Sequence, residues 1–437
     1  MSPGPIRFFM KRLTRSLCLI LVSAALAACT TTPPTPAPPS SGAIAAPQEG
    51  PLVVPPLSAL PETAPRPLSG KFARAAWTDV PGWTDDDLSG FWPVFLRDCR
   101  GLMRPVSGSL AVPARAAPRA WQPVCAAAAA QGSSDPAAVR QFLQTWLQPW
   151  RLNGPDNRPA SNLVTGYYEP MVSGSLQRGG AYQWPLYAVP GDLLTIDLGA
   201  VYPELAGKRV RGKLVGRRIV PYDSRAQIEA SDHKPPVLVW IDDPIDNFFL
   251  QVQGSGLVRL TSGPDSGQVL RLAYADHNGR PYVSIGRWLA DHGQMPLSQT
   301  SMQNIRAWAK RNPARVQEML DANPAVVFFR ADKLSDPALG PNGAYGLPLT
   351  PKRSIAVDAH FVPLGTPVFL ATTEPGSSLP MSRLVLAQDT GTAIQGAARA
   401  DFYWGTGDAA GQQAGRMKQR GEMWLLWPKQ AGEPSAR

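Results

Sequence analysis

The chain has 437 residues with a formal net charge of +10, and it contains 47 Pro and 39 Gly. Hydrophobic residues reach 44% and charged residues 17%, which excludes a fully disordered chain, and no Gly-X-Y period of the collagen kind is present. The length suits two or three domains, and low charge with many Pro and Gly favours a loop-rich β protein over a helical bundle.

Residues 1–28 have the features of a secretory signal. Four basic residues precede an apolar stretch over 17–26 that is too short to cross a bilayer. The stretch ends in Leu26-Ala27-Ala28-Cys29, which resembles the bacterial lipoprotein box, where the signal is cut before a cysteine that then carries lipid. An ordinary cleaved signal with an incidental Cys29 is the alternative. Thr30, in place of Asp, favours the outer membrane by resemblance to lipoprotein sorting, so we expect a lipid-anchored protein on its periplasmic face.

A tether is expected to follow over residues 29–67. Residues 30–67 contain 12 Pro in 38 positions. This composition is typical of semi-rigid spacers, which have too few apolar side chains to form a core. Without residues 1–28 the chain keeps 39 basic and 33 acidic residues, a charge of +6. This charge suits an acidic polymer such as cell wall or phospholipid, and simple solubility is the alternative. The chain has no dense Lys/Arg run or motif typical of nucleic-acid binding.

The cysteines predict one disulfide. Cys18 would leave with the signal, and Cys29 would carry the lipid. Cys99 and Cys125 remain as an even pair in an oxidising compartment, which predicts that they are bonded to each other. Two free, buried thiols are the alternative.

Helices are expected in a few places, where a capping residue precedes apolar residues at helical spacing. They run from Thr84 towards Cys99, from Asp135 to just before Pro149, from Thr300 to Asn312, and from Pro313 to Leu320.

Short apolar runs between Gly and Pro predict strands elsewhere. These runs are 163–168, 237–241, 248–252, 326–329, 368–370 and 384–387. Strands without regular intervening helices favour a closed, barrel-like β architecture over a doubly wound sheet. The mixed stretch from about 180 to 320 could form a second domain.

Common cofactor and metal motifs are missing from the sequence. The four histidines have no metal-ligand spacing, and there is no P-loop, dinucleotide fingerprint or nucleophile elbow. We therefore predict no metal and no cofactor. Residues 253–256, Gln-Gly-Ser-Gly, are better explained by backbone approach to a ligand than by a nucleophilic Ser255.

Three aspartates of the C-terminal third are the candidate catalytic residues. Asp358 opens the segment 358–366, and Asp389 ends an apolar strand before Thr390-Gly391. Asp401 lies among aromatic residues that could raise its pKa by burial and stack against sugars. A carboxyl that stays protonated near neutral pH is what a general acid for glycosidic cleavage requires. Taken alone, an Asp before Thr-Gly is commonly a turn or cap residue.

Together, these three segments resemble the three-aspartate domain of the membrane-bound lytic murein transglycosylase A family. Other blocks between about residues 80 and 430 are similar to blocks of that family and follow the same order. They are Gly166-Tyr167-Tyr168-Glu169-Pro170, Val252-Gln253-Gly254-Ser255-Gly256, Ser284-Ile285-Gly286, Ser301-Met302-Gln303, and Asn323-Pro324 through Phe328-Phe329.

The resemblance implies a mainly β fold. This is a double-psi β-barrel with a smaller inserted β domain, a groove between the two and a few flanking helices. We expect helices and the first part of the barrel over 68–180, the inserted domain over 181–320, and the second part of the barrel with the three aspartates over 321–430.

The resemblance also implies an activity. The family cleaves the β-1,4 bond between N-acetylmuramic acid and N-acetylglucosamine in peptidoglycan without water, and leaves a 1,6-anhydromuramoyl end. By motif position Asp401 would be the single acid and base, with Asp389 and Asp358 in supporting roles. The expected glycan contacts are Tyr167, Tyr168, Gln253, Gly254 and Ser255.

A single catalytic carboxyl is chemically sufficient for this reaction. Ordinary glycosidases use two because water or a nucleophile must be activated on the opposite face, whereas here the substrate's own C6 hydroxyl attacks. Two alternatives remain: a hydrolytic muramidase that pairs Asp401 with Asp389, and a catalytically silent peptidoglycan-binding lipoprotein. The expected partners are peptidoglycan strands, the membrane through the N-terminal lipid, and a wall-remodelling complex. We expect a monomer.

Overall fold

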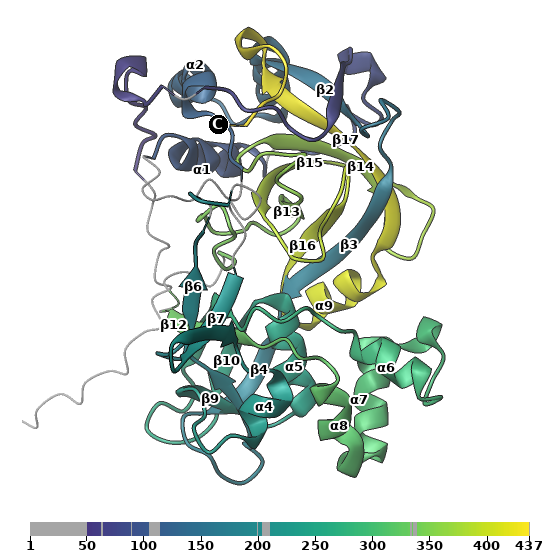
Figure 1. Cartoon of the computed structure of the whole chain (residues 1–437). Coiled ribbons are helices and arrows are strands. Elements are labelled where there is room, and N and C mark those ends of the chain that lie inside the picture. Colours follow the sequence, from purple (N-terminus) through teal and green to yellow (C-terminus); the bar gives the residue numbers. More distant parts are fainter. Residues whose placement is uncertain are drawn as a thin grey trace, which may run out of the picture. The chain divides into compact units, whose positions relative to one another are not determined.

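The computed structural model describes residues 50–62, 64–88, 90–104, 114–198, 200–202, 210–332, 334 and 339–436 (Figure 1). The expected signal peptide and Cys29 lie outside these residues. No helix in the described ranges is long and apolar enough to cross a membrane.

A closed ring of strands forms a barrel (Figure 1). Among the described residues, the largest sheet has the order β1-β2-β17-β14-β15-β13-β16-β3, and β17 also pairs with β3, so the run from β17 to β3 closes on itself. Its strands are β1 Lys71–Arg74, β2 Leu147–Asn153, β3 Asn162–Glu169, β13 Ser354–Val357, β14 Pro367–Thr373, β15 Pro380–Asp389, β16 Ala400–Thr406 and β17 Lys418–Pro428. Pairing is parallel between β13 and β15 and between β3 and β16. The predicted mainly β, barrel-containing fold class is confirmed.

Helix α9, Gly407–Arg416, packs directly on the barrel. A Cβ atom added at Gly166 of β3 would lie 2.7 Å from the Cα atom of Ala414. The helix can therefore approach the strand this closely because position 166 has no side chain.

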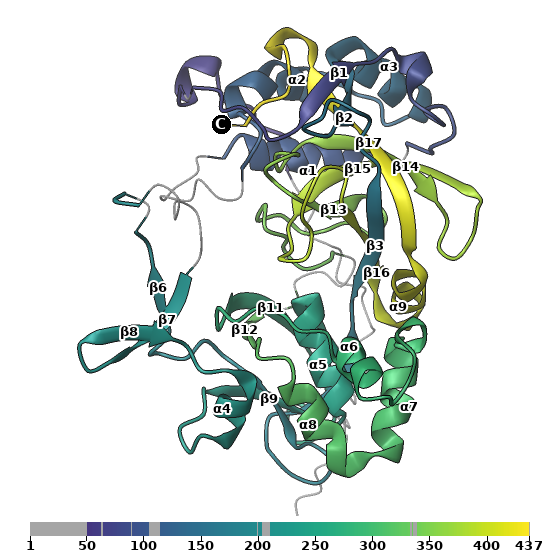
Figure 2. The same cartoon turned by 45° about the vertical axis from the view of Figure 1, so that its right-hand side comes forward.

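Helices α1 Trp92–Leu102, α2 Pro118–Ala130 and α3 Pro136–Trp146 lie at the end of the barrel near β1 and β2 (Figures 1 and 2). Aromatic side chains connect these helices to the barrel. The Trp121 ring of α2 lies 6.4 Å from Phe95 of α1 and 5.8 Å from Trp427 of β17, with edge-to-face geometry in both pairs. The helices thus extend the main hydrophobic core.

Cys99 of α1 and Cys125 of α2 form a disulfide, as predicted, with their Cα atoms 5.6 Å apart. Replacing both cysteines by Ala should lower the free energy of unfolding by about 3 kcal/mol, because the bond closes a loop with a sequence separation of 26. Denaturant titration of the double variant measures this loss. Reduction of the wild-type protein should cause a similar decrease, and unchanged midpoints in both experiments would contradict the prediction.

A second region is inserted between β3 and β13. Its larger sheet has the order β12-β11-β10-β4-β9-β5. The strands are β4 Met171–Ser175, β5 Trp184–Tyr187, β9 Val237–Ile241, β10 Ser255–Leu260, β11 Val269–His277 and β12 Val327–Asp332. The helices are α4 Arg225–Ala230, α5 Pro244–Gln253, α6 Ile285–Asp291, α7 Met302–Arg311 and α8 Val316–Asp321. We propose 171–332 as the inserted region, wider than the expected 181–320, because β4 and β12 belong to this sheet.

A separate small sheet is formed by β6 Leu194–Ile196, β7 Val210–Val215 and β8 Arg218–Pro221. We call it the β6–β8 sheet. Short 3-10 helices complete the described structure at Leu57–Ala59, Trp77–Asp79, Leu297–Gln299, Pro313–Arg315 and Lys429–Ala431.

A buried ion pair joins the barrel to the inserted sheet. Arg271 of β11 donates from Nε to Glu169 Oε1 at 2.8 Å and from Nη2 to Glu169 Oε2 at 3.1 Å. Thr406 of β16 donates its hydroxyl to the same Oε2 at 3.2 Å. The Glu169 side chain is fully buried, and Glu169 is the last residue of β3 before the chain enters the inserted region.

Several predicted elements are confirmed. Helix α3 begins after Asp135, whose carboxylate accepts the N–H groups of Ala137 and Ala138, and α7 covers most of the expected third helix. The N-cap of α7 is Ser301, one residue later than predicted. The strands expected at 163–168, 237–241, 326–329, 368–370 and 384–387 correspond to β3, β9, β12, β14 and β15.

The start of the first helix was predicted wrongly. Helix α1 begins at Trp92 and not after Thr84. Asp86 was expected in the first turn after a Thr84 cap, but its buried carboxylate accepts Arg353 Nη1 at 2.6 Å and the N–H of Leu384 at 2.8 Å. These bonds hold the segment against β15.

The strand predicted at 248–252 is also wrong, because these residues belong to helix α5. Asp243 caps the helix by accepting the N–H groups of Ile245 and Asp246, and Pro244 follows at its first position. A short buried apolar run does not by itself distinguish a strand from a helix.

The described part of the expected tether lies against the folded body. Leu60 is buried in the main core. Gln122 donates to the carbonyl of Pro55 at 3.1 Å, and the backbones of Arg66 and Ala436 exchange two hydrogen bonds of 2.8 and 2.9 Å. We therefore propose that the folded body begins near residue 50, before the expected boundary at 67.

Candidate active site

A cleft of about 1530 Å³ is lined by loops of the barrel and by the inserted region. From the barrel come the loops that follow β13 and β15, and from the inserted region the end of α5 and the segment after β11. The predicted site residues that line the cleft are Tyr167, Gln253, Gly254, Ser255, Asp358 and Asp389. Asp401 and Tyr168 are not among its lining residues.

Asp401 is held in place by a chain of hydrogen bonds. Strand β16 pairs in parallel with β3 so that Asp401 lies opposite Thr165. Thr165 donates its hydroxyl to Asp401 Oδ1 at 2.7 Å, and Arg399 Nη2 donates to the Thr165 oxygen at 3.0 Å. A hydroxyl has a single proton, and the Arg399 donor leaves it directed at Asp401. Oδ2 of Asp401 is then the oxygen that remains for a transferable proton.

The electrostatic environment of Asp401 favours its protonated form. Burial, with a smaller contribution from the nearby charge of Asp389, raises the pKa of Asp401 to about 6. The Thr165 hydrogen bond and the Arg399 charge act in the opposite direction. A carboxyl that titrates near pH 6 can both donate and accept a proton under near-neutral conditions.

Asp389, the last residue of β15, accepts hydrogen bonds on both carboxylate oxygens. Oδ1 accepts the N–H groups of Ala344 and Thr390, each at 2.9 Å, and Oδ2 accepts the Tyr167 hydroxyl at 3.1 Å. Burial raises the pKa of Asp389, and these three donors oppose that increase. The arrangement positions a carboxylate beside Asp401.

Tyr167 connects this carboxylate to the cleft. Burial and the charges of Asp389 and Asp401 raise the pKa of Tyr167 well above its ordinary value, so the phenol keeps its proton and donates it to Asp389. Its ring centroid lies 5.2 Å from that of Tyr403. The structure thus brings Asp401, Asp389 and Tyr167 together at the ends of β3, β15 and β16.

Asp358 has a different position, at the turn after β13. Its Oδ1 accepts the backbone N–H of His360 at 3.0 Å and lies 2.9 Å from His360 Nδ1, while Oδ2 accepts the N–H of Gly396 at 2.8 Å. The carboxylate therefore connects the loop after β13 to the loop after β15. Both loops line the cleft, so Asp358 shapes its wall.

The turn at the end of α5 lies at the wall of the cleft. Gly254 has a φ of +77° and donates its N–H to the carbonyl of Leu250 at 3.0 Å, a left-handed helix end that favours glycine. The Gln253 side chain accepts the N–H of Tyr168 at 3.1 Å. The Tyr168 side chain itself lies in the main core, with its hydroxyl 3.7 Å from Met302 Sδ, and does not reach the cleft.

Sequence reasoning missed Thr165 and Arg399 as functional candidates. Arg399 precedes Asp401 by two residues, so strand alternation places both side chains on one face and could have identified it. Thr165 lies 236 residues away in the chain, and its contact depends on the pairing of β3 with β16. No local pattern indicates that pairing.

Comparisons with known proteins match most of the described chain to one family. Residues 163–330 match the family model described as the MltA specific insert domain, and residues 353–427 match that of the 3D domain. Membrane-bound lytic murein transglycosylase A of Escherichia coli (strain K12) is 31% identical over 295 residues, which cover 66% of this chain and 71% of that protein.

Solved structures are similar over most of the chain. MltA from Neisseria gonorrhoeae, in its monoclinic form, has a TM-score of 0.69 at 34% identity and covers 85% of this chain and 98% of its own. Escherichia coli MltA with bound chitohexaose has a TM-score of 0.57 at 27% identity, with coverage of 83% and 95%.

Proposed function

The chain belongs to the membrane-bound lytic murein transglycosylase A family, and on that premise we propose that it is a peptidoglycan lytic transglycosylase. It cleaves the β-1,4 bond between N-acetylmuramic acid and N-acetylglucosamine without water and leaves a 1,6-anhydromuramoyl end. The observation that carries this proposal is the half-buried Asp401, whose pKa is raised to about 6 and whose Oδ2 remains for proton transfer.

In the proposed reaction Asp401 acts twice. Its Oδ2 first donates a proton to the glycosidic oxygen as the C1–O bond breaks and positive charge develops on the muramoyl ring. The resulting carboxylate then accepts the proton of the C6 hydroxyl as the C6 oxygen bonds to C1. The attacking group is part of the substrate, so its effective concentration is high and Asp401 ends the cycle protonated again.

The neighbouring residues have supporting roles in this proposal. Asp389 provides negative charge beside Asp401 that favours the developing positive charge, and Tyr167 orients Asp389. Asp358 holds the loops of the cleft wall, and Gln253 to Ser255 contact glycan. The bound chitohexaose in a family structure supports a glycan ligand for this cleft.

The hydrolytic alternative requires Asp389 to activate a water molecule. Its two oxygens already accept three hydrogen bonds, which disfavours that role. Mass spectrometry of sacculus digestion products separates the two reactions, because the anhydro product is lighter by one water than its hydrolytic counterpart. Hydrolysed ends would contradict the proposal, and binding without any product would indicate the silent, peptidoglycan-binding alternative.

We also propose export and lipidation at Cys29, on the periplasmic face of the outer membrane. Relatives named as membrane-bound support attachment to a membrane. Radiolabelled palmitate should be incorporated by the wild-type chain and not by Cys29→Ala, and fractionation should find the lipidated protein in the outer membrane. A monomer that joins a wall-remodelling complex is part of the same proposal.

The hydrogen bond from Thr165 to Asp401 can be tested by mutation. Thr165→Val should shift the alkaline limb of the pH–activity profile to higher pH by about one pH unit. The Thr165 hydrogen bond stabilises the carboxylate of Asp401, and its loss raises the pKa of the acid, so the acid keeps its proton to higher pH. Thr165→Ser, which keeps the hydroxyl, is the matched control. Initial rates on sacculi between pH 5 and 8 measure the limb.

Asp389→Asn provides a test in the opposite direction. The charge of Asp389 raises the pKa of Asp401, so its removal should move the alkaline limb to lower pH. Limbs that move in the same direction in the Thr165→Val and Asp389→Asn variants would contradict this account of the site.

A further inference from the structure

The β6–β8 sheet has one face made entirely of apolar residues. Its antiparallel register places Ile196 opposite Val210 and Leu214 opposite Ile219. Opposed residues share a face, as do alternate residues along a strand. The side chains of this face, which we call the apolar face, are Leu194, Ile196, Val210, Leu214, Ile219 and Pro221.

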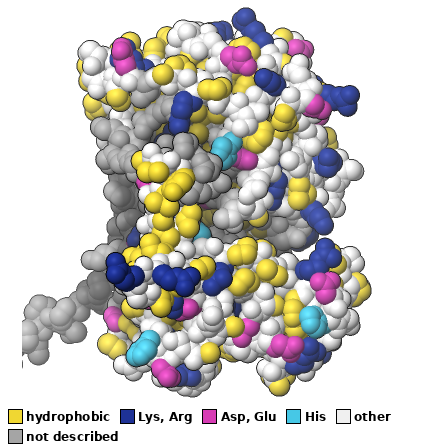
Figure 3. Space-filling model, viewed as in Figure 1, with side chains coloured by type: hydrophobic (Ala, Val, Ile, Leu, Met, Phe, Trp, Pro, Cys, Tyr) yellow, Lys and Arg dark blue, Asp and Glu magenta, His cyan; other side chains and the backbone are white. Residues whose placement is uncertain are grey.

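The apolar face is exposed to solvent. Leu214 is 62% exposed, Ile219 53% and Val210 39%. Antiparallel sheets with one apolar face normally pack that face on a core. In the space-filling view, hydrophobic side chains gather where Figure 1 places β6 and β7, with a row of Lys and Arg side chains below them (Figure 3).

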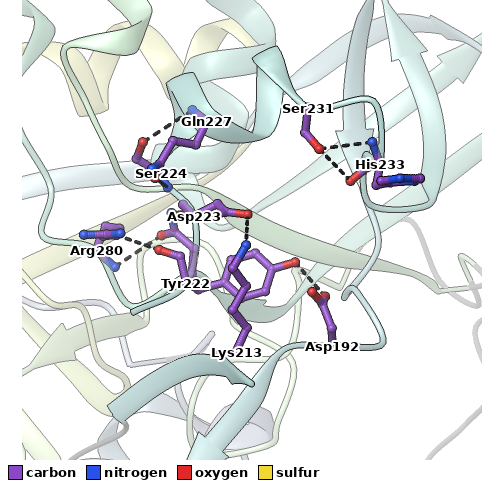
Figure 4. Close-up of polar contacts among 10 residues, drawn as sticks. Asp192, Lys213, Tyr222, Asp223, Ser224, Gln227, Ser231, His233 and Arg280 are labelled. Atoms are coloured by element: carbon purple, nitrogen blue, oxygen red, sulfur yellow. Dashed lines mark hydrogen bonds and ion pairs between the residues drawn. The ribbon is translucent and has the colours of Figure 1, made fainter. Parts of the chain in front are cut away.

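The opposite, polar face is fixed to the inserted region. Lys213 Nζ of this face lies 2.5 Å from Asp223 Oδ2, in the segment after β8, and in that segment Tyr222 donates its hydroxyl to Asp192, which precedes β6, at 2.8 Å (Figure 4). Arg211 of the same face pairs with Asp276 at 2.8 Å. These contacts hold the polar face inwards, so the apolar face cannot turn towards the core without breaking them.

Basic residues lie at the tip of the sheet, where β7 turns into β8. Arg217 and Arg218 are exposed and follow Gly216, whose φ of +59° permits the tight turn. Arg218 lies opposite Val215 on the polar side of the hairpin and Ile219 lies on the apolar face, so the exposed tip has arginines beside apolar residues of both faces. Arginine side chains beside an apolar surface match the phosphates and acyl boundary of an anionic bilayer.

The length of chain before the folded body keeps such a bilayer within reach. Residues 30–49 separate Cys29 from the first described residue. Even as an extended polyproline helix, this segment would span about 60 Å. A lipid on Cys29 would therefore keep the start of the folded body that carries the β6–β8 sheet within about 60 Å of the membrane in which that lipid is inserted.

We propose that the apolar face of the β6–β8 sheet docks on an anionic phospholipid bilayer. Leu214 and Ile219 enter the boundary between headgroups and acyl chains, and Arg217 and Arg218 contact lipid phosphates. This contact is a second membrane attachment beyond the proposed lipid anchor, and it goes beyond the proposed enzymatic function.

The test uses residues 30–437, produced without signal or lipid. This fragment keeps the folded body, because the core clusters of the described chain lie within residues 50–436. It should float with vesicles of roughly one part phosphatidylglycerol to two parts phosphatidylcholine. Leu214→Glu with Ile219→Glu should lower the bound fraction at least about tenfold. Leu379→Glu, at a leucine that is 66% exposed outside the sheet, should bind like the wild type.

A second pair of variants tests the charges. Arg217→Gln with Arg218→Gln should lose about tenfold or more in binding to the anionic vesicles, with little change on pure phosphatidylcholine. Thermal unfolding checks that each variant is folded, and activity on membrane-free sacculi should equal that of the wild type. Flotation thus tests membrane docking, and activity on membrane-free sacculi tests the proposed enzymatic function, so the two proposals can fail separately.

Four results would overturn the docking proposal, and three of them concern vesicles or the oligomeric state. These three are absence of wild-type flotation, undiminished flotation of the double Glu variant, and a dimer in light scattering that the double Glu variant abolishes. The last result would assign the apolar face to a second copy of the chain. Sacculus binding lost in the same variant would assign it to glycan and would also overturn the proposal.

Discussion

Replacing Asp401 by Asn should lower the release of anhydro products from sacculi by about 10³-fold or more. Asn cannot donate the proton that the glycosidic oxygen needs, and it cannot accept the proton of the C6 hydroxyl. The Thr165 hydroxyl can still donate to the Asn oxygen, so the barrel should remain folded and sacculus binding should be retained. Product mass spectrometry and a sacculus pull-down measure the two properties separately.

The pH profile gives an independent check on the same carboxyl. Wild-type activity should fall by about tenfold per pH unit well above pH 6, because the protonated form of Asp401 is the proposed acid and its pKa is raised to about 6. Asp408→Asn, which removes an exposed carboxylate in the first turn of α9, should behave like the wild type. An Asp401→Asn protein with substantial activity would end the assignment.

Replacing Arg271 by Met should lower the free energy of unfolding by about 3–5 kcal/mol at pH 7. The substitution leaves the fully buried Glu169 carboxylate without the guanidinium that neutralises it. Its remaining donor is the Thr406 hydroxyl, which does not compensate a buried charge. Denaturant titration measures the loss.

Two comparisons test the electrostatic origin of this loss. Burial raises the pKa of Glu169, so the folded state binds a proton more strongly than the unfolded chain and the Arg271→Met protein should become relatively more stable as pH falls. Adding Glu169→Gln removes the uncompensated charge and should recover a large part of the stability. A double variant no more stable than Arg271→Met would point to lost packing instead.

Local sequence signals predicted two of the described helices that have side-chain caps, α3 and α7, and missed others such as α5. Asp135 before Pro136 identified α3, yet the same Asp-Pro pair at 243–244 was outweighed by the strand-like run that follows it. The acidic run that contains Asp86 is typical of the first turn of a helix, but the Asp86 carboxylate is bound to Arg353 instead. A capping side chain can be predicted from sequence only when no residue distant in the chain binds that side chain instead.

Closure of the barrel could not be derived from local patterns. It depends on the pairing of β17 with β3, which joins residues 418–421 to 162–165. The resemblance to a known family predicted this architecture, because each strand by itself is a short apolar run. The same resemblance predicted catalytic and supporting roles for Asp401 and Asp389, and it did not indicate the hydrogen-bonded pair of Arg399 and Thr165 beside Asp401.

The β6–β8 sheet illustrates another limit of sequence patterns. Alternation along a strand separates two faces, but it does not say which face turns outwards. Here that choice depends on ion pairs such as Lys213 with Asp223 and Arg211 with Asp276, which hold the polar face against the inserted region.

The place where the chain ends has a practical consequence. Ala436 lines the cleft, and its backbone is hydrogen-bonded to that of Arg66, which also lines the cleft. An affinity tag fused at the C-terminus would therefore begin at the cleft wall, beside the proposed glycan site. A tag inserted in the exposed turn at Gly376 would begin away from the residues that line the cleft.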